Sequence, residues 1–332
     1  MNEIDFVVTW VDGNDPAWQA EKRKYDGASG DSSDTRYRDW DLLRYWFRGV
    51  EKYAPWVRKI HFVTWGHVPE WLDTGNPKLN IVKHTDFIPP QYLPTFNSHT
   101  IELNMHRIPG LAEQFVYFND DMYITNATTP ELFFKKGYPC ATFGLEVIKH
   151  KKGGIGHILA TDIAIINEHF FMRKVLKKNW KKVLSPVNGI KHVIRTGMLS
   201  LCTSYFPGLY DWHSAVSFNK STFEEVWKEE DVILDNTCRC RFRQDINVSP
   251  YVFEYWQMAT GKFAPRSEKY SKTYQLNDNN VDDMINTLRS GKYRIMCIND
   301  TEKLTDWEDA AQKTKEAFES IYSDKCSYEK SV

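Results

Sequence analysis

The sequence predicts an α/β fold with a Rossmann-like mixed sheet and a helical insertion. Short apolar runs of strand length alternate with amphipathic helical stretches over the first 125 residues, in the order strand, helix, strand, strand, helix, strand. The length of 332 residues allows about two domains, or one large α/β unit that carries an insertion. With 42% hydrophobic and 26% charged residues, the chain can build an ordinary core and is not disordered.

The N-terminal elements follow from the spacing of the apolar residues. The first run, IDFVVTW, is rich in β-branched and aromatic residues and is broken sharply by DGNDP. Leu42, Leu43, Trp46, Phe47 and Val50 recur at helical spacing. The pattern therefore predicts strands at residues 4–10, 59–65, 79–84 and 115–118, and helices at residues 39–53 and 98–107.

The middle of the chain is predicted to be mostly helical. Residues 145–204 form the predicted helical insertion, and residues 1–144 and 205–332 form the predicted α/β catalytic core. The insertion contains MRKVLKKNWKKVL at residues 172–184, which predicts a basic amphipathic helix. Such a helix can lie on an anionic membrane surface, or it can be an ordinary solvated helix on a globular body.

The C-terminal region returns to alternating elements. A helix is predicted at residues 281–289, a strand at residues 293–298 and a long amphipathic helix at residues 307–322. A late strand that is followed by a helix indicates that the C-terminal region rejoins the first sheet. The inserted helical segment is then expected to form a lid over the core.

Composition and absent motifs argue against several function classes. The chain has 43 Lys and Arg against 44 Asp and Glu, so it lacks the basic excess of a dedicated nucleic-acid binder. No P-loop, dinucleotide-binding, nucleophile-elbow or zincin motif occurs. No apolar run reaches transmembrane length and the N-terminus lacks signal-peptide features, so we expect a cytoplasmic protein. The six cysteines are scattered, which is typical of reduced structural thiols.

The first candidate site is the sequence Asn-Asp-Asp at residues 119–121. It directly follows a predicted buried strand, and ligands of open α/β sheets bind beyond the carboxyl ends of strands. Two adjacent carboxylates there can hold a hard divalent cation together with phosphate oxygens of a substrate. This placement suits a nucleotide-sugar transferase, in which a metal neutralises the diphosphate. The alternative is that the acidic pair serves only the chemistry of a turn.

The second candidate is the turn at the end of the first predicted strand. Thr9, Trp10 and Asp12 lie in the sequence TWVDG, where the apolar run stops. The turn can present a carboxylate and an aromatic face to a base or a ribose. The alternative for the tryptophan is an ordinary place in an aromatic core.

The third candidate combines a histidine with alternating arginines. His213 stands in a loop-like stretch, and Arg239, Arg241 and Arg243 recur with period two in CRCRFR. On an extended segment the three arginines point the same way and form a positive rim that suits phosphate binding. A histidine near such a rim can act as a general base. The alternative is a set of solvated structural arginines.

Taken together, these segments resemble the Stealth family of sugar-phosphate transferases. IDFVVTWVDGNDP at residues 4–16 is similar to one family block, and the most specific block runs from RYRDWDLLRYWF through LPTFNSHTIELNMHR to FVYFNDDMYI. A third block covers residues 213–261, and a fourth begins with IMCIND at residues 295–300. The family includes bacterial capsular polysaccharide phosphotransferases and the catalytic subunit of the lysosomal-enzyme N-acetylglucosamine-1-phosphotransferase.

The resemblance implies a glycosyltransferase-like fold and the transfer of hexose-1-phosphate from a UDP-sugar to a hydroxyl of a glycan acceptor. The acceptor oxygen would attack the β-phosphorus, UMP would leave, and a phosphodiester would form in capsule or surface polysaccharide synthesis. Phosphoryl transfer relies mainly on positioning and electrostatics, so Mg²⁺ or Mn²⁺ and an arginine are expected. The expected partners are the UDP-hexose donor and a lipid-linked or growing oligosaccharide. The basic helix at residues 172–184 adds the expectation of peripheral contact with the inner face of the plasma membrane, and the charge balance predicts no nucleic-acid partner.

The resemblance also implies roles for individual residues. Asp120 and Asp121 match the family motif that we interpret as the metal and diphosphate site. His213 matches the essential histidine and is the candidate base, and Arg243 is expected to stabilise charge on the transferred phosphoryl group. The other matching positions are expected to bind the donor or support the site: Asp12, Arg36, Asp39, Arg44, Asn97, Ser98, Glu102, His106, Asn119 and Asn299.

One position departs from the family pattern. Four residues after Arg243 the family usually has Asp, whereas this chain has Asn247, with Asp245 nearby. This leaves open whether Arg241 or Arg243 is the working arginine. Two other functions also stay open: an ordinary glycosyltransferase that moves only the sugar and releases UDP, and a catalytically inactive carbohydrate-binding protein. The intact acidic pair, with His213 and Arg243 present, argues against the inactive protein.

Overall fold

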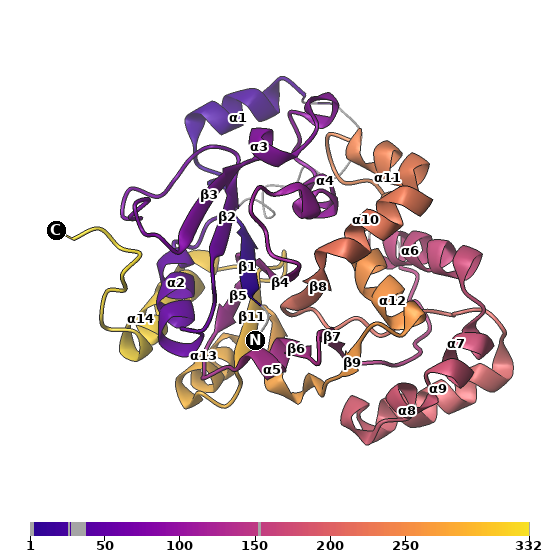
Figure 1. Cartoon of the computed structure of the whole chain (residues 1–332). Helices are drawn as coiled ribbons and strands as arrows, with labels where there is room; N and C mark the ends of the chain where they lie inside the picture. The colour runs from indigo at the N-terminus through magenta and orange to yellow at the C-terminus, as the bar shows by residue number, and fades with distance from the viewer. Residues whose placement is uncertain (1–2, 26, 28–37, 152–153, 332) are drawn as a thin grey trace.

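A computed structural model describes residues 3–25, 27, 38–151 and 154–331. Its largest sheet has five strands in the order β3-β2-β1-β4-β8 (Figure 1). Four strands run parallel and the fifth is antiparallel to its neighbour: β1 (Ile4–Thr9), β2 (Ile60–Thr64), β3 (Leu79–Lys83) and β4 (Gln114–Asn119), then β8 (Val216–Asn219). The predicted α/β fold with a mixed sheet is therefore confirmed.

Both faces of this sheet are buried, and alternate residues of a strand enter different cores. In β1, Phe6 packs into one core with the helices α2 (Leu43–Tyr53) and α14 (Trp307–Ile321). Val7 packs into the other core with α12 (Tyr251–Thr260). Strands that are buried on both faces have nearly continuous apolar sequences. This burial explains why the run at the N-terminus predicts the first strand correctly.

The helices of the N-terminal half are shorter than the apolar spacing predicts. The predicted helix at residues 98–107 is divided into α4 (Ser98–Leu103) and a 3₁₀ turn (Met105–Arg107). Asn104 separates them, and its side chain donates to the carbonyl of Thr100 at 2.8 Å. An asparagine that bonds the local backbone in this way competes with helix continuation. Three further short helices complete this half: α1 (Pro16–Arg23), α3 (His84–Phe87) and α5 (Pro130–Phe133).

A second sheet contains β5 (Met122–Ile124), β10 (Ser271–Gln275) and β11 (Ile295–Asn299), in the order β10-β11-β5. The expectation that the late strand rejoins the first sheet is therefore wrong. One edge of β11 pairs with β10 in parallel and the other edge pairs with β5 in antiparallel, so both edges are occupied. Because β5 follows β4 after a turn at Asp120 and Asp121, the second sheet lies directly beside the acidic pair.

The middle segment contains α6 (Gly156–His169), α7 (Met172–Lys178), α8 (Trp180–Val183) and α9 (Ile190–Cys202). The predicted continuous helix over residues 172–184 is wrong, because Asn179 interrupts it. The backbone of Asn179 has φ −108° and ψ 21°, and its side chain donates to the carbonyl of Val175 at 3.1 Å. The division of the chain into a catalytic core and an insertion stays a prediction.

The remaining elements complete the cores and a small third sheet. They are β6 (Phe134–Lys135), β7 (Tyr138–Ala141), β9 (Ala264–Pro265), α10 (Lys220–Glu229), α11 (Asp231–Cys238) and α13 (Val281–Ser290). All six cysteines are free thiols. Within the part of the chain that the structure describes, no helix has both the length and the apolar character needed to cross a bilayer.

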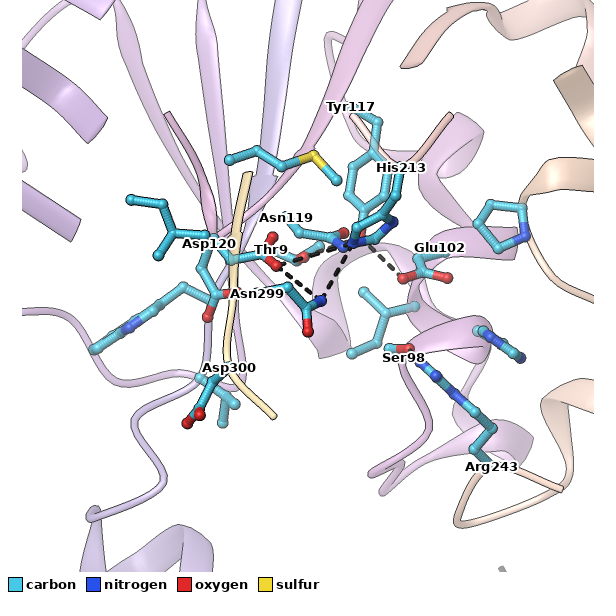
Figure 2. Close-up of a pocket in the computed structure, with 18 of the residues that line it drawn as sticks. Thr9, Ser98, Glu102, Tyr117, Asn119, Asp120, His213, Arg243, Asn299 and Asp300 are labelled. Carbon is cyan, nitrogen blue, oxygen red and sulfur yellow. Dashed lines mark hydrogen bonds and ion pairs between the residues drawn. The ribbon is translucent and has the colours of Figure 1, made fainter. Parts of the chain in front are cut away.

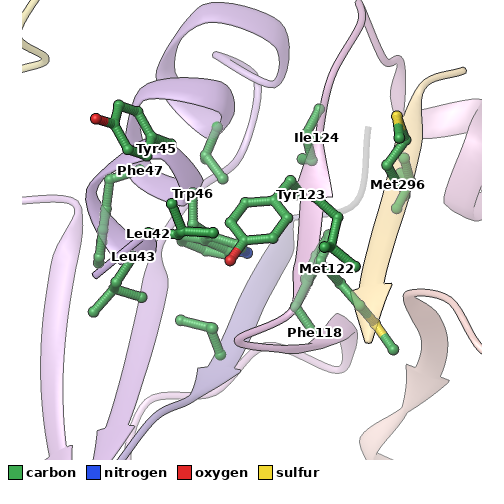
Figure 3. Close-up of a cluster of buried hydrophobic side chains, with 14 of the residues drawn as sticks. Leu42, Leu43, Tyr45, Trp46, Phe47, Phe118, Met122, Tyr123, Ile124 and Met296 are labelled. Carbon is green, nitrogen blue, oxygen red and sulfur yellow. The ribbon is translucent and has the colours of Figure 1, made fainter. Parts of the chain in front are cut away.

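A buried cluster joins α2 to both sheets (Figure 3). Trp46 of α2 packs on Phe118 of β4, with ring centroids 5.6 Å apart and an interplanar angle of 82°. Gly49 lies in the same helix, where a Cβ atom would come within 2.5 Å of the backbone oxygen of Ile124 in β5. Helix α2 can therefore approach β5 this closely because residue 49 has no side chain.

We expect Gly49→Ala to lower the free energy of unfolding by about 1–3 kcal/mol, because the new methyl group overpacks a filled interface. Helix propensity alone predicts that the substitution raises the free energy of unfolding, since alanine is favoured over glycine by roughly 1 kcal/mol within a helix. Gly197→Ala in α9 is the matched control, because a Cβ atom there meets nothing within 4 Å. Urea unfolding of both variants separates the effects, and stabilisation of both would contradict the close approach at Gly49.

Candidate active site

Polar side chains gather around a cavity of about 810 Å³ at the carboxyl ends of β1, β4 and β11 (Figure 2). Thr9 ends β1, Asn119 ends β4 and Asn299 ends β11, so both sheets contribute to its wall. Ser98 and Glu102 line another side from α4. The volume is within the range of small-molecule sites, roughly 300–1,000 Å³.

The acidic pair occupies the turn between β4 and β5. Asp120 is exposed at the cavity wall, but loss of solvation by the surrounding protein, reinforced by the charges of Asp121 and Asp39, raises its pKa to about 8. Asp121 Oδ2 accepts a hydrogen bond from Asn299 Nδ2 at 3.2 Å. Asp121 Oδ1 is buried and finds no hydrogen-bond partner among the described residues. A buried carboxylate oxygen without a partner is unfavourable, so this arrangement suits a bound cation.

The carboxylate oxygens of the acidic pair are suitable ligands for a hard divalent cation. Ligand atoms of Asp121, His213 and Cys297 lie within 4.8 Å of one another. Cys297 Sγ donates to Asp121 Oδ2 at 3.3 Å, and burial together with the neighbouring aspartates raises the pKa of the thiol well above its usual value. A thiol is a soft ligand, which hard cations such as Mg²⁺ bind poorly. Mg²⁺ and Mn²⁺ prefer oxygen ligands, which Asp120 and Asp121 offer.

His213 lines the cavity and lies close to Asn299 (Figure 2). Its Nε2 lies 3.5 Å from Asn299 Nδ2 and 3.9 Å from Asp121 Oδ2. Burial lowers the pKa of the imidazole, but Asp121, Asp211 and Glu102 outweigh this effect, so the pKa of His213 is raised. A proton that arrives at this ring is therefore stabilised by the surrounding carboxylates.

The other ring nitrogen of His213 is held from behind by α12. Nδ1 lies 3.2 Å from the hydroxyl of Tyr251, the first residue of that helix. The backbone N–H of Tyr251 donates to Ser249 Oγ at 3.3 Å. Ser249 in turn donates to Asp162 of α6 through its N–H at 2.9 Å and its Oγ at 2.5 Å. Because Nδ1 is engaged by the tyrosine, Nε2 is the nitrogen that faces the cavity.

Arg243 lies across the cavity from the acidic pair, beside α4 (Figure 2). Its Nη2 donates to Ser98 Oγ at 2.5 Å. Burial raises the pKa of Glu102, and the positive charge of Arg243 and the hydrogen bond from Tyr117 partly offset that rise. Tyr117 donates to Glu102 at 3.0 Å. The guanidinium is therefore held at the wall by the hydroxyl of Ser98, near the buried Glu102.

The expectation that the three alternating arginines point the same way is wrong. Arg239 caps the C-terminus of α11 with a helical backbone, φ −76° and ψ −16°, and pairs with Asp235 at 2.6 Å. Arg241 donates to two backbone carbonyls of residues 92–94, at 2.8 and 2.6 Å. Arg243 alone of the three lines the cavity. The chain leaves a helix here instead of forming a strand, so a period of two does not place side chains on one side.

Comparison with known proteins assigns this chain to a family. Residues 2–30 match the model of Stealth protein CR1, conserved region 1, and residues 36–141 match that of Stealth protein CR2, conserved region 2. The receptor polysaccharide phosphotransferase WefC of Streptococcus oralis is 40% identical over 335 residues, which cover 99% of this chain and 100% of the relative. The chain belongs to the Stealth family. The predicted resemblance is confirmed.

Other Stealth relatives also match along their full length. The capsular polysaccharide phosphotransferase WcwK of Streptococcus pneumoniae is 39% identical, covering 99% of this chain and 100% of the relative. The exopolysaccharide phosphotransferase cps2G of Lactiplantibacillus plantarum is 33% identical, covering 99% and 96%. Among solved structures, the galactosyltransferase LgtC aligns over 95% of both chains at 11% identity with a TM-score of 0.40, which is too weak a likeness to support a conclusion.

The predicted site residues of this Stealth protein divide into two groups. Those that line the cavity are Thr9, Trp10, Asp39, Ser98, Glu102, Asn119, Asp120, Asp121, His213, Arg243 and Asn299. Those that the structure places outside the cavity lining are Asp12, Arg44, Asn97, His106 and Arg241. Arg36 lies outside the described residues.

Asn97, from the second group, supports the wall of the cavity from behind. Asn97 is the N-cap of α4, and its Nδ2 donates to Asn247 Oδ1 at 3.0 Å. The same oxygen accepts from the backbone N–H of Gln244 at 2.9 Å. Asn247, the position that departs from the family pattern, therefore ties the loop that carries Arg243 to α4. His106 is buried, and burial lowers its pKa to about 3, so it stays neutral in the core.

Sequence reasoning missed Asp300, Tyr251 and Cys297 as parts of the site. Asp300 Oδ2 accepts from Arg38 Nη1 at 3.0 Å and from Trp40 Nε1 at 3.2 Å. Asp300 comes directly after β11. It could therefore have been found by the same rule that identified residues 119–121, namely that polar residues directly after a buried strand are candidates for ligand binding. No comparable signal marks the tyrosine or the cysteine, because both lie within apolar segments whose pattern predicts only burial.

Proposed function

We propose that this protein transfers hexose-1-phosphate from a UDP-sugar to a hydroxyl group of a glycan acceptor in capsule or surface polysaccharide synthesis. The observation that carries the proposal is the arrangement of an acidic pair, a histidine and an arginine around one cavity. Relatives that cover the whole chain are named polysaccharide phosphotransferases, which supports a phosphoryl group as part of what moves.

The acidic pair is proposed to hold the diphosphate end of the donor through Mg²⁺ or Mn²⁺. The cation, when bound, neutralises charge on the diphosphate and on the leaving nucleotide. Asp120 and Asp121 can both supply oxygens, and the partnerless Oδ1 of Asp121 is available for this purpose. Thr9, Asp39 and Asn119 stand around the same end of the cavity, where they can bind the donor.

His213 is proposed to accept the proton of the acceptor hydroxyl through Nε2. The contact of Nδ1 with Tyr251 orients the ring, and the chain of hydrogen bonds to Asp162 fixes the tyrosine in turn. Asp211 and Glu102 are further carboxyl groups that favour a proton on the ring of His213. His213 is therefore held in a fixed orientation in which Nε2 can accept the proton.

The proposed step forms one bond and breaks one. The acceptor oxygen forms a bond to the β-phosphorus, the bond between that phosphorus and the oxygen that bridges to the α-phosphate breaks, and UMP leaves with the bridging oxygen. The hydroxyl proton passes to His213, and the bond between the sugar and its phosphate is unchanged. Arg243, held by Ser98, supplies a positive charge for the oxygens of the phosphoryl group.

The acceptor is proposed to be a lipid-linked or growing oligosaccharide at the inner face of the plasma membrane. Such an acceptor would be presented to a cytoplasmic enzyme that makes peripheral membrane contact. The relatives named for capsular, receptor and exopolysaccharide substrates support a glycan as the acceptor class.

The nucleotide product tests the proposed function. The protein is incubated with a panel of UDP-hexoses, Mg²⁺ or Mn²⁺ and a bacterial glycan acceptor, and the released nucleotides are separated. We expect UMP, in an amount that depends on the acceptor. Release of UDP instead would mean that only the sugar moves, as in an ordinary glycosyltransferase.

Substitutions of Arg243 and Arg241 are expected to have different effects. Arg243→Ala should lower kcat by roughly 10²–10³-fold with little change in stability, because it removes a charge at the cavity wall. Arg241→Ala should mainly lower the free energy of unfolding, because two backbone carbonyls lose their donor. Measuring kcat and the urea midpoint for both variants separates the roles. Full activity of Arg243→Ala would exclude it as the working arginine.

A further inference from the structure

Helix α9 turns an apolar face outward, which is the reverse of an ordinary surface helix. Four large side chains on it are mostly exposed: Ile190 (70%), Ile194 (57%), Met198 (64%) and Leu201 (83%). Their spacing of four, four and three residues places them on one side of the helix. Single exposed apolar residues are common, but a continuous stripe marks an interaction surface.

The two buried residues of α9, His192 and Thr196, are polar and contact the body of the protein. His192 Nε2 contacts Glu268 Oε2 at 3.2 Å, and Thr196 Oγ1 accepts from the backbone N–H of Leu145 at 2.9 Å. Arg195 Nε donates to the carbonyl of Leu145 at 2.7 Å. These bonds fix the rotation of the helix about its own axis. The outward direction of the apolar stripe is therefore determined by the fold.

Exposed apolar side chains also occur on the segment that precedes α9. Leu184 and Val187 are 49% and 45% exposed, and they lie at the end of α8 and in the 3₁₀ turn that contacts α9. Trp180 at the start of α8 is 56% exposed. Figure 1 shows α7, α8 and α9 together at one end of the molecule, away from the large sheet. We call these residues and the stripe on α9 the apolar face.

Exposed basic side chains occur on α7 and α8, at the same end of the molecule as α9. The five are Arg173, Lys174, Lys177, Lys178 and Lys181. No carboxylate among the described residues forms an ion pair with any of the five. Lys181 Nζ instead lies 5.7 Å from the ring centre of Trp180. Aromatic and basic side chains beside an apolar stripe are typical of helices that lie in the interface of a membrane.

We propose that the apolar face and these five basic residues dock the protein on an anionic lipid surface. The charge of the surface favours an anionic lipid surface as the binding partner, because negative headgroups complement the five basic side chains, which form no ion pair among the described residues. A second copy of the same face would instead bring two sets of positive charges together. The proposal deepens the proposed function, since docking would hold the cavity near a lipid-linked acceptor, but lipid binding itself requires no transfer chemistry.

Vesicle sedimentation with the full chain tests this docking. We use vesicles of phosphatidylglycerol mixed equally with phosphatidylcholine, and vesicles of phosphatidylcholine alone, at low and high salt. Binding is expected to the anionic vesicles and to weaken with salt. Ile194→Asp with Leu201→Asp should weaken it by about tenfold or more, because both side chains leave the apolar phase. Val232→Asp on α11, where the side chain is 70% exposed, is the matched control and should bind normally.

Two results would overturn the docking proposal. One is equal sedimentation of the wild type and the double variant with anionic vesicles. The other is a dimer of the wild type in analytical ultracentrifugation that the double variant abolishes, because the apolar face would then be an interface between copies. Turnover on a soluble acceptor is measured in parallel. Wild-type protein that binds vesicles yet releases no UMP would count against the proposed function and not against docking.

Discussion

His213→Gln is expected to lower the rate of transfer by roughly 10²–10⁴-fold, the range typical of a lost general base. Glutamine keeps a polar side chain of similar reach but cannot accept a proton near neutral pH. Nε2 of His213 is the ring nitrogen that faces the cavity, 3.5 Å from Asn299 Nδ2, so the substitution removes the proton acceptor without opening a large void. Single-turnover rates with saturating donor and acceptor give the measurement.

Two further variants test whether the loss of rate in His213→Gln is specific to the proposed base. Tyr251→Phe removes the hydroxyl that contacts Nδ1, so it should reduce the rate less than His213→Gln does, by about tenfold for one lost hydrogen bond. His157→Gln changes an exposed histidine on α6 and should leave the rate unchanged. If His213→Gln retained full turnover while folding normally, the assignment of the base would have to be given up.

Asp121→Asn is expected to lower the rate of transfer by roughly 10³-fold or more, because a bound cation contributes several kcal/mol and each 1.36 kcal/mol is tenfold. The amide keeps the size of the side chain but removes its charge, and its nitrogen cannot ligate a hard cation. Asp121 Oδ1 is buried without a partner among the described residues, which is why this carboxylate is the sharper target of the pair.

The effect of Asp121→Asn should appear in metal binding as well as in turnover. We expect the affinity for Mn²⁺, measured by calorimetry in the presence of UDP, to fall together with the rate. Asp282→Asn, which changes an exposed carboxylate in the first turn of α13, is the matched control. Unchanged Mn²⁺ affinity and an unchanged metal dependence of turnover in Asp121→Asn would remove the acidic pair as the metal site.

The acidic turn and the large sheet were predictable because both depend on local order in the sequence. Strands such as β1 and β4 are buried on both faces, so their sequences are nearly continuous apolar runs. A carboxylate pair immediately after such a run must lie at the carboxyl end of the sheet. That rule places residues 119–121 without any knowledge of long-range contacts.

The second sheet was not predictable because its pairing depends on contacts far apart in the chain. β5 has three residues and joins β11, which lies more than 170 positions later. Nothing in the local pattern of β11 distinguishes this partner from an edge of the large sheet. The contact between His213 and Tyr251 has the same origin, since the two residues come from separate segments that the fold brings together.

The arginines at positions 239–243 show how a correct pattern can give a wrong geometry. Their period of two places side chains together only on an extended segment. The backbone there leaves α11 in a helical conformation, so Arg239 and Arg241 turn to Asp235 and to backbone carbonyls while Arg243 reaches the cavity. The sequence alone contains no signal for this turn.

The fate of the β-phosphorus tests the central claim most directly. A UDP-hexose donor is prepared with one label in the β-phosphorus and a separate label in the hexose, and the glycan product is isolated after incubation with the protein and Mn²⁺. The account predicts that both labels enter the acceptor in equal amounts and that UMP is released. Entry of the hexose label alone, with the labelled phosphorus left in UDP, would contradict it.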